Sequence, residues 1–419
     1  MDRALSQQVR TRRVFYVPGY DPIHPRRYRE LYRREGAAQA LISGYEIAVR
    51  PRSKQDGYFG WQVTGEIDGC RTEAEFEVLG WSDIVRDSMS NSIPATYLQL
   101  VRTAWTYLST GTLWRLMRLR KGPVLAALYP IAMLLGQLGL ALLCGVFLCW
   151  VVIAGTDRLA GLSGGAAQAI PIAVGIIAGI GTAIAVLRWF RRRDGAFFAY
   201  YLMHDYAHAA SARGANPPEL ERRMSDFAGR IGAALHSDVD EVLVVGHSSG
   251  AHLSVSILAD LIRGGHVSSD GPVLSFLSLG QVVPMVSFLP DAHRLRGDLR
   301  YLSARDALTW IDVTAPGDGC AFALCDPVAV SGVAPPDKKW PIVFSAAFTQ
   351  SLSPARWKAL RWRFFRLHFQ YLCAFDRPKD YDYFQITAGP QTLGARYADR
   401  PPSRSRIDHA VSKYTSVAA

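Results

Sequence analysis

Two long stretches without a charged side chain dominate the hydrophobic pattern of the chain. They cover residues 122–156 and 159–187. A helix that crosses a bilayer needs about 20 mostly apolar residues, whereas a core helix of a soluble protein normally keeps one polar face. We therefore predict two transmembrane spans, at about 131–154 and 166–187, with Pro130 ending an approach segment before the first.

The residues beside these stretches predict how they are oriented. Both outer flanks are basic: Arg115, Arg118, Arg120 and Lys121 precede the first span, and Arg188, Arg191, Arg192 and Arg193 follow the second. The connector carries only Asp157 and Arg158. Positive residues stay on the cytoplasmic side, so we expect an integral, two-span protein of a bacterial inner membrane with both termini cytoplasmic.

Small residues and an amphipathic segment extend this membrane interpretation. The second span carries a face of small residues, Gly175, Gly179, Gly181 and Ala183, which suits close packing against the first span. Residues 95–121 have an amphipathic pattern. They predict one helix that leads into the first span and lies along the membrane interface.

Outside the hairpin, the pattern alternates between strands and helices. Short β-type runs lie at 14–17, 45–49, 59–67, 74–79, 241–245, 273–279, 308–313 and 341–348. Helical patterns lie at 26–35, 217–236, 251–262 and within 354–372. This alternation predicts an α/β fold with a mostly parallel sheet flanked by helices.

The domain boundaries follow from these patterns. Residues 1–121 and 194–395 are expected to form one cytoplasmic α/β domain, interrupted by the transmembrane hairpin at 122–193. Residues 396–419 are predicted to be a flexible tail because prolines and serines interrupt any periodicity. Residues 1–13 lack the apolar core of a secretory signal, so we expect no cleaved leader.

The formal charge of +11 and the pI near 9.4 first favour an anionic partner. Arginines beside the spans account for part of this charge, and no zinc finger, RNP-type or basic-helix motif is present. We therefore expect the lipid bilayer as a partner and no nucleic acid. Six irregularly spaced cysteines, with four residues between Cys320 and Cys325, fit neither a zinc site nor a disulfide framework. We predict no metal and no cofactor.

One motif carries candidate chemistry: VLVVGHSSGAHLSV, from Val242 to Val255. A strand-like run ends at Gly246, His247 and Ser248 follow, and a helix-like run starts after Gly250. A nucleophile elbow needs this order, with small residues that let strand and helix approach each other. We predict that Ser248 is a nucleophile, the alternative being an ordinary Gly-rich turn. His247 is expected to line the site or to pack beneath it.

In this context the sequence resembles the α/β-hydrolase superfamily, in particular its lipase- and esterase-like members, with the two-helix hairpin as an insertion. The resemblance implies the chain order serine, acid, histidine. It implies Asp318, just after the second strand beyond the elbow, as the acid, with Asp326 and Asp312 as alternatives. His368, beyond the last strand, is the implied base.

The resemblance also implies an oxyanion hole made of two backbone N–H groups. One is expected from Ser249. The other is expected from Tyr20 in the stretch YVPGYDP, where Gly19 lets the backbone turn. No histidine precedes this glycine, unlike the HGGG-type loop of many lipases.

The implied function is a membrane-anchored serine hydrolase that cleaves small-molecule or lipid acyl esters through a Ser-His-Asp triad and an acyl-enzyme. The sequence leaves open esterase, thioesterase and lipase activity, and the oligomeric state. The alternative is a catalytically idle, membrane-tethered scaffold with the same fold. A transporter fits poorly because the two spans carry no charge.

Overall fold

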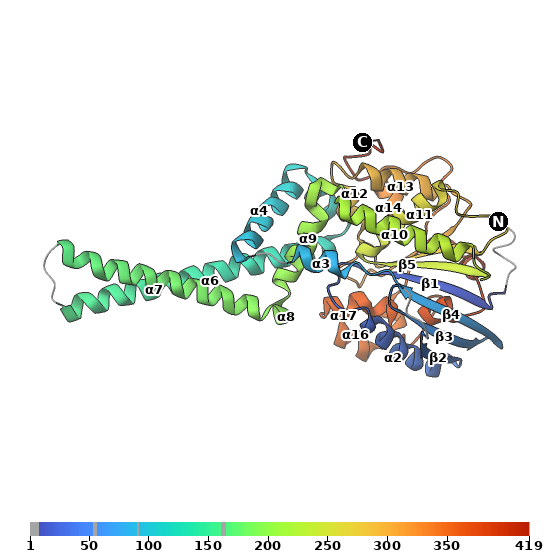
Figure 1. Ribbon diagram of the computed structural model, residues 1–419, viewed down its shortest axis with the longest axis horizontal. Helices are drawn as coiled ribbons and strands as arrows, with labels where there is room; N and C mark the ends of the chain where they lie inside the picture. The colour runs from blue at the N-terminus through green and yellow to red at the C-terminus, as the bar shows by residue number, and fades with distance from the viewer. Residues whose placement is uncertain (1–7, 53–56, 90–91, 161–164, 419) are drawn as a thin grey trace. The chain divides into compact units, whose positions relative to one another are not determined.

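The computed structural model describes residues 8–52, 57–89, 92–160 and 165–418, and the chain divides into two compact units. Unit 1 comprises Met1–Asp87, Thr106–Val124 and Ala209–Ala419. Unit 2 comprises Ser88–Trp105 and Leu125–His208. Unit 1 holds the sheet, and unit 2 holds most of the two longest helices (Figure 1).

Unit 1 is built on a mixed sheet, which in the described part of the chain has eight strands in the order β2-β3-β4-β1-β5-β6-β7-β8. The strands are β1 (Thr11–Val17), β2 (Glu46–Pro51), β3 (Gly60–Ile67), β4 (Cys70–Val78), β5 (Glu241–His247), β6 (Val273–Leu279), β7 (Thr309–Thr314) and β8 (Ile342–Ser345). The α/β prediction is confirmed, but the sheet is not purely parallel. Strand β3 runs antiparallel to both of its neighbours, whereas β4, β1, β5, β6, β7 and β8 are mutually parallel.

A tight turn explains the antiparallel pairing of β3 with β4. Asp68 and Gly69 join the two strands and both have positive φ, 54° and 71°. Two residues of this kind form the hairpin turn whose twist matches the strands. A two-residue connection can only join antiparallel strands, so β3 reverses direction within an otherwise parallel sheet.

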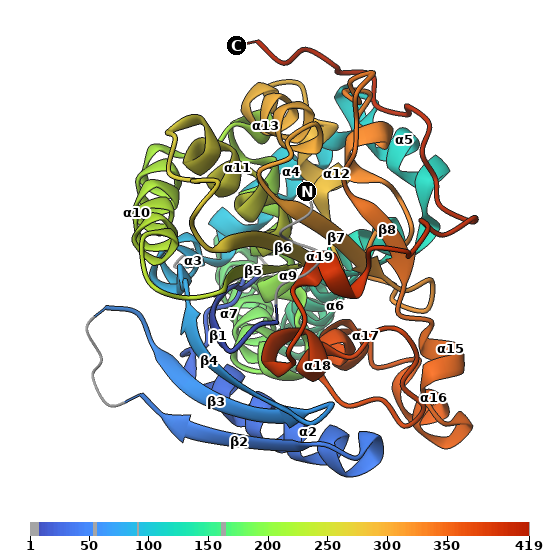
Figure 2. The ribbon, with the colours of Figure 1, turned by 90° about the vertical axis from the view of Figure 1, so that its right-hand side faces the viewer.

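Helices cover both faces of the sheet. Those of unit 1 are α2 (Arg26–Ser43), α5 (Thr112–Leu119), α10 (Pro218–Leu235), α11 (Ser249–Arg263), α12 (Val283–Ser287), α13 (His293–Ser303), α14 (Pro327–Val330), α15 (Phe348–Ser351), α16 (Pro354–Leu360), α17 (Phe364–His368), α18 (Tyr383–Ala388) and α19 (Leu393–Arg396), with 3₁₀ turns at Ser211–Gly214 and Phe369–Leu372. Helix α3 (Ser82–Ser88) ends at the boundary of unit 1. Figure 2 shows α10, α11 and α13 on one side of the sheet and α2, α17 and α18 on the other.

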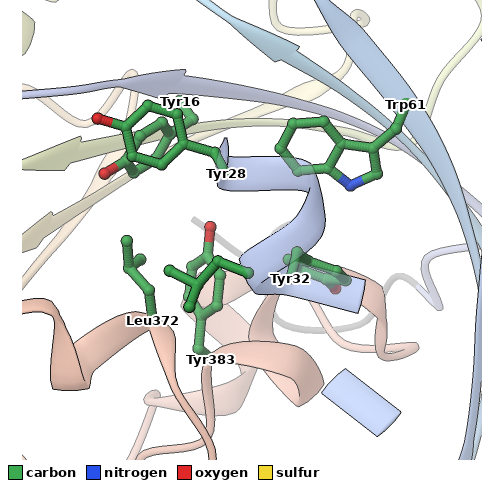
Figure 3. Close-up of a pocket in the computed structure, with 7 residues that line it drawn as sticks. Tyr16, Tyr28, Tyr32, Trp61, Leu372 and Tyr383 are labelled. Atoms are coloured by element: carbon green, nitrogen blue, oxygen red, sulfur yellow. The ribbon is translucent and has the colours of Figure 1, made fainter. Parts of the chain in front are cut away.

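Central strand β5 is buried along its whole length, which explains its unbroken apolar run in the sequence. On the α2 side of the sheet the core is aromatic. Tyr32 packs between Trp61, Phe76, Tyr383 and Phe384. Figure 3 shows part of this cluster, a small cavity lined by Tyr16, Tyr28, Leu31, Tyr32, Trp61, Leu372 and Tyr383.

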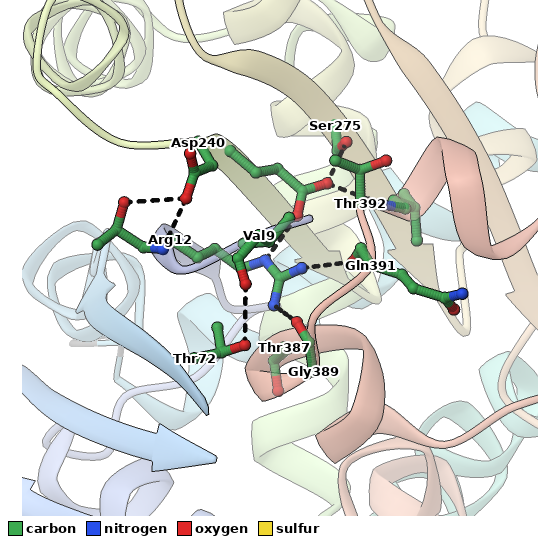
Figure 4. A network of polar contacts seen from close by, with 12 residues as sticks. Val9, Arg12, Thr72, Asp240, Ser275, Thr387, Gly389, Gln391 and Thr392 are labelled. Carbon is green, nitrogen blue, oxygen red and sulfur yellow. Dashed lines mark hydrogen bonds and ion pairs between the residues drawn. The ribbon is translucent and has the colours of Figure 1, made fainter. Parts of the chain in front are cut away.

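A buried ion pair holds residues 389–391 against the sheet (Figure 4). Arg12 Nε donates to Glu241 Oε2 at 2.6 Å, and both side chains are fully buried. Arg12 Nη1 and Nη2 donate to the carbonyls of Gly389 and Gln391 at 2.9 and 2.6 Å. A buried pair of charges is tolerated only when its other hydrogen-bonding positions are also filled, so this network holds β1, β5 and residues 389–391 in one arrangement.

Besides α3, whose last residue is Ser88, the helices with residues in unit 2 are α4 (Ile93–Ser109), α6 (Lys121–Ala160), α7 (Gly165–Arg192), α8 (Asp194–Phe197) and α9 (Ala199–Ala210). Two stretches, Lys121–Thr156 and Ala169–Arg192, are long and apolar enough to cross a membrane by length and composition. The two helices approach each other closely at Gly175 and Gly179, two of the small residues for which the sequence predicted helix packing. A Cβ added to Gly145 would lie 2.6 Å from the Gly179 carbonyl oxygen, and one added to Gly175 would lie 3.0 Å from that of Cys149. Gly181 takes no part, because an added Cβ there would meet nothing within 4 Å.

Three predicted boundaries were wrong. Pro130 lies inside α6, since a single lost hydrogen bond does not end a long apolar helix. Residues 95–121 do not form one helix: Gly111, at φ 70°, separates α4 from α5, and Arg120 is extended before α6 begins. The predicted strand 341–348 is shorter because Ala347 has positive φ. The side chains of Asp157 and Arg158 lie outside what the structure describes.

Residues 396–418 have little regular structure and follow the surface of unit 1. Backbone N–H groups of Ser403, Ile407 and Val411 donate to carbonyls of residues 343, 324 and 330 at 2.7–3.0 Å. The segment predicted as a tail therefore lies against the protein rather than extending away from it.

Candidate active site

Ser248 occupies a sharp turn between β5 and α11. Its φ of 56° and ψ of −122° fall where residues other than glycine are rarely found. A Cβ on Gly250 would lie 2.0 Å from the Val17 carbonyl oxygen, and one on Gly246 would lie 2.8 Å from Ala251 Cα. Both glycines are therefore required by close backbone approach, and together they hold Ser248 at the tip of the turn.

The loop after β1 reaches the same edge of the sheet. β1 pairs in parallel with β5, and Val17 lies opposite Gly246. A Cβ on Gly19 would lie 3.0 Å from Ser248 Cβ and 3.4 Å from its Oγ, so this loop directly adjoins the serine. Ser249 opens α11, and the first N–H groups of a helix have no acceptor within it.

Tyr20 follows Gly19 in this loop, and its buried ring lies at 73° to the Trp81 ring, with the two centroids 5.9 Å apart. The geometry brings the loop that carries Tyr20 to Ser248. The donation of the Tyr20 and Ser249 N–H groups to a substrate oxygen stays a prediction.

Asp318 and His368 contact each other although 50 residues separate them. His368 Nδ1 lies 2.7 Å from Asp318 Oδ2, and both side chains are buried. The same carboxylate accepts the Cys320 N–H at 2.9 Å and the Tyr371 hydroxyl at 3.0 Å. Burial by itself opposes ionisation of Asp318, but the adjacent His368 and these hydrogen bonds outweigh it and lower the pKa of the carboxyl group.

The two alternative acids do not contact His368. Asp312 lies within β7, where its carboxyl group accepts from the Ser278 hydroxyl at 2.5 Å and burial raises its pKa to about 8. Asp326 caps α14 by accepting from two backbone N–H groups and pairs with Lys338 at 2.6 Å. Of the three aspartates, only Asp318 is placed to orient the imidazole.

His368 lies against the turn that carries Ser248. The Ser248 N–H donates to the Leu279 carbonyl at 2.9 Å. A Cβ on the next residue, Gly280, would lie 3.1 Å from His368 Cε1 and 2.7 Å from the Tyr371 ring. No hydrogen bond joins Ser248 Oγ to the His368 ring in the described part of the chain. Such bonds often tighten only when substrate binds.

His247 supports the site from beneath. Its Nε2 lies 3.0 Å from the His368 carbonyl oxygen, and the two rings are 4.8 Å apart. Since a carbonyl only accepts, His247 Nε2 carries the proton. Burial, followed by the nearby His368, lowers the pKa of His247 to about 3, so it remains a neutral donor that holds the backbone of His368.

The sequence reasoning missed Tyr371. It follows His368 by three residues, the spacing that places two side chains on one side of a helical segment. A tyrosine at this spacing from the implied base could have been recognised in the sequence as a second partner of the acid. The Tyr371 hydroxyl and His368 Nδ1 share Asp318 Oδ2, whereas Oδ1 accepts the Cys320 N–H, so three partners set the orientation of the carboxylate.

Asp318, Cys320 and His368 each offer one ligand atom, all within 4.8 Å of one another. Within the described residues, this is the group that comes nearest to a metal site beside the serine. Its Asp318 and His368 atoms are already hydrogen-bonded at 2.7 Å, so a metal held by all three would have to open that bond.

Comparisons of this chain with protein-family models, with curated proteins and with solved structures find no match.

Proposed function

We propose that this chain is a membrane-anchored serine hydrolase that cleaves acyl esters. The observation that supports this most strongly is the buried contact between Asp318 and His368, placed beside a serine in a strained strand-to-helix turn. A strained backbone at a buried polar cluster is typical of functional sites. An idle scaffold with the same fold would keep the turn but would not need the Asp318–His368 contact.

In the proposed mechanism Ser248 Oγ attacks the ester carbonyl carbon while His368 Nε2 accepts its proton. The Asp318 carboxylate holds Nδ1–H, so that Nε2 is free to accept, and stabilises the imidazolium that forms. The developing oxyanion is stabilised by the N–H groups of Ser249 and Tyr20. The alcohol leaves with the proton from His368, and water then releases the acyl group by the same route.

We also propose that unit 1 has an α/β-hydrolase-type fold. The serine follows β5, a central parallel strand, Asp318 follows β7, and His368 lies beyond β8. This is the chain order that the elbow architecture requires. The oxyanion loop follows β1, which is first in the chain but lies directly beside β5 in the sheet.

The membrane assignment rests on hydropathy and charge. The two apolar helices are proposed to span a bacterial inner membrane, with their arginine-rich flanks and both termini in the cytoplasm. Helix α4 exposes Leu98, Val101 and Trp105, which recur at helical spacing on one face and suit a membrane interface. A tethered enzyme of this kind would meet lipidic acyl esters, the substrate class we propose.

Labelling with a fluorophosphonate probe tests the proposal. Detergent-solubilised wild type should be labelled, whereas Ser248→Ala and His368→Ala should not. Ser249→Ala is the matched control: it removes the adjacent hydroxyl but keeps the backbone N–H, so labelling should persist. Absence of labelling in folded wild type would favour the idle scaffold. Labelling that is lost in Ser249→Ala but kept in Ser248→Ala would show that Ser248 is not the nucleophile.

A further inference from the structure

The segment that precedes His368 is basic, aromatic and exposed. From the end of α16 into α17 the sequence reads KALRWRFFR, from Lys358 to Arg366, and no acidic residue occurs between positions 354 and 368. The side chains of Trp362 and Phe364 are 73% and 48% exposed. Large exposed aromatic residues next to each other are unusual on a protein surface and mark contact sites.

The cations around these aromatic residues lack a carboxylate partner within the described part of the chain. Among those residues, no ion pair is formed by Lys358, Arg361, Arg363 or Arg366. The Arg361 guanidinium instead lies over the Trp362 ring, 5.6 Å from its centroid. We call this set of residues (Lys358, Arg361, Trp362, Arg363, Phe364 and Arg366) the basic aromatic surface.

We infer that the basic aromatic surface docks on an anionic lipid bilayer. Trp is suited to the headgroup layer, where its ring is apolar and its N–H stays hydrated. Arginines without a carboxylate partner complement the anionic headgroups, and their apolar stems lie beside the aromatic rings. Single-stranded nucleic acid also binds to cations interleaved with aromatic side chains, but the two long apolar helices of this chain favour a bilayer as the occupant. This inference rests on the membrane anchoring proposed above and not on the hydrolase activity.

The basic aromatic surface is connected to the candidate site through packing. A Cβ on Gly317 would lie 2.7 Å from the Trp357 ring, and one on Gly319 would lie 3.2 Å from the Phe364 ring. Trp357 and Phe364 therefore pack against both neighbours of Asp318. Helix α17, which begins at Phe364, ends at His368. Figure 1 shows α16 and α17 side by side in orange. Docking through this surface would bring the Asp318 loop and His368 close to the headgroups.

Hydrogen exchange of the full chain in lipid nanodiscs tests the inference. Phosphatidylcholine discs are compared with discs that contain phosphatidylglycerol. Amides of residues 361–366 should exchange at least about tenfold more slowly in the anionic discs, and added salt should remove the difference. Each arginine near an anionic surface contributes about fivefold to the docking equilibrium. Arg361→Gln/Arg363→Gln/Arg366→Gln should therefore lower it about a hundredfold and abolish the protection.

One control variant and one further test variant complete the experiment. Arg33→Gln/Arg34→Gln/Arg71→Gln removes three exposed arginines from α2 and β4 and should leave the protection unchanged. Trp362→Ser/Phe364→Ser keeps every charge and should reduce it. Equal protection in neutral and anionic discs, protection that appears only when single-stranded RNA is added, or no protection at all would overturn the inference. Fluorophosphonate labelling in detergent should persist in the arginine variants, which separates this result from the test of the proposed activity.

Discussion

Replacing Asp318 with asparagine is the most demanding test of the proposed mechanism. The change alters one atom in a site where the carboxylate meets His368 Nδ1 at 2.7 Å, the Tyr371 hydroxyl at 3.0 Å and the Cys320 N–H at 2.9 Å. The asparagine side chain can keep the bond from Cys320 through its carbonyl oxygen. Its NH₂ group then faces Nδ1, which must become an acceptor.

The expected loss follows from this switch of tautomer. When Nδ1 accepts, Nε2 carries the proton and cannot take one from Ser248. The imidazolium formed during reaction also loses its buried counter-charge. In the serine-protease triad the equivalent change lowers kcat about 10⁴-fold. Because Asp318 is buried and carries a lowered pKa, we expect a loss of about 10³- to 10⁴-fold in kcat with little change in KM.

The assay is hydrolysis of p-nitrophenyl esters, with the rate of fluorophosphonate labelling as a second measure. Asp312→Asn is the matched control, since that carboxyl group is also buried but has a pKa of about 8 and is mostly protonated at neutral pH. It should keep kcat within a few fold. If Asp318→Asn retained more than a tenth of wild-type kcat, or Asp312→Asn lost as much, the assignment of the acid would be wrong.

Three further changes test other parts of the site. Tyr371→Phe removes a hydrogen bond to an ionised group and should lower the free energy of unfolding at pH 7 by about 2 kcal/mol. Folding lowers the pKa of Asp318, so its carboxylate contributes its full stability above the unfolded pKa of about 4 and loses it as pH falls further. The difference between variant and wild type should therefore shrink below about pH 4. Gly250→Ala puts a Cβ 2.0 Å from the Val17 carbonyl oxygen, so it should abolish labelling and lower the free energy of unfolding by several kcal/mol. The control Gly229→Ala, in α10, places its Cβ where nothing lies within 4 Å and should raise the free energy of unfolding by about 1 kcal/mol. Equal effects of the two substitutions would contradict the close approach at Gly250. His247 stays neutral in the folded protein down to about pH 3, so its contribution to stability is complete above about pH 6.5 and is lost as pH falls. In denaturant titrations, the free energy of unfolding of His247→Gln should decline less steeply with falling pH than that of wild type, by up to about 1.4 kcal/mol per pH unit. Equal pH slopes for variant and wild type would refute the assignment of His247 as buried and neutral.

Local sequence was sufficient for the elements that carry the candidate site. The run from Val242 to Val255 contains a strand, a Gly-flanked serine and a helix start, and each is decided by neighbours within a few residues. The structure has β5 and α11 on either side of Ser248, as the pattern predicts. The apolar helices could likewise be predicted, because hydropathy over about 20 residues needs no knowledge of packing.

Partners far apart in the chain were decided by tertiary structure. Asp318, Asp326 and Asp312 all lie in or after the same strand, and the sequence left the choice between them open. Folding buries Asp312 in β7, uses Asp326 as a helix cap, and sets only Asp318 against His368. The contribution of Tyr371 and the neutral role of His247 also depend on contacts that no local pattern reports.

Sequence alone determined the α/β class, the two apolar helices and the strained serine turn, because each depends on periodicity or on steric limits of the local backbone. Tertiary structure decided which carboxylate meets the histidine and that residues 396–418 lie against unit 1. These outcomes depend on which surfaces meet when the chain closes. A hydrogen bond between residues 50 positions apart is set by the fold as a whole.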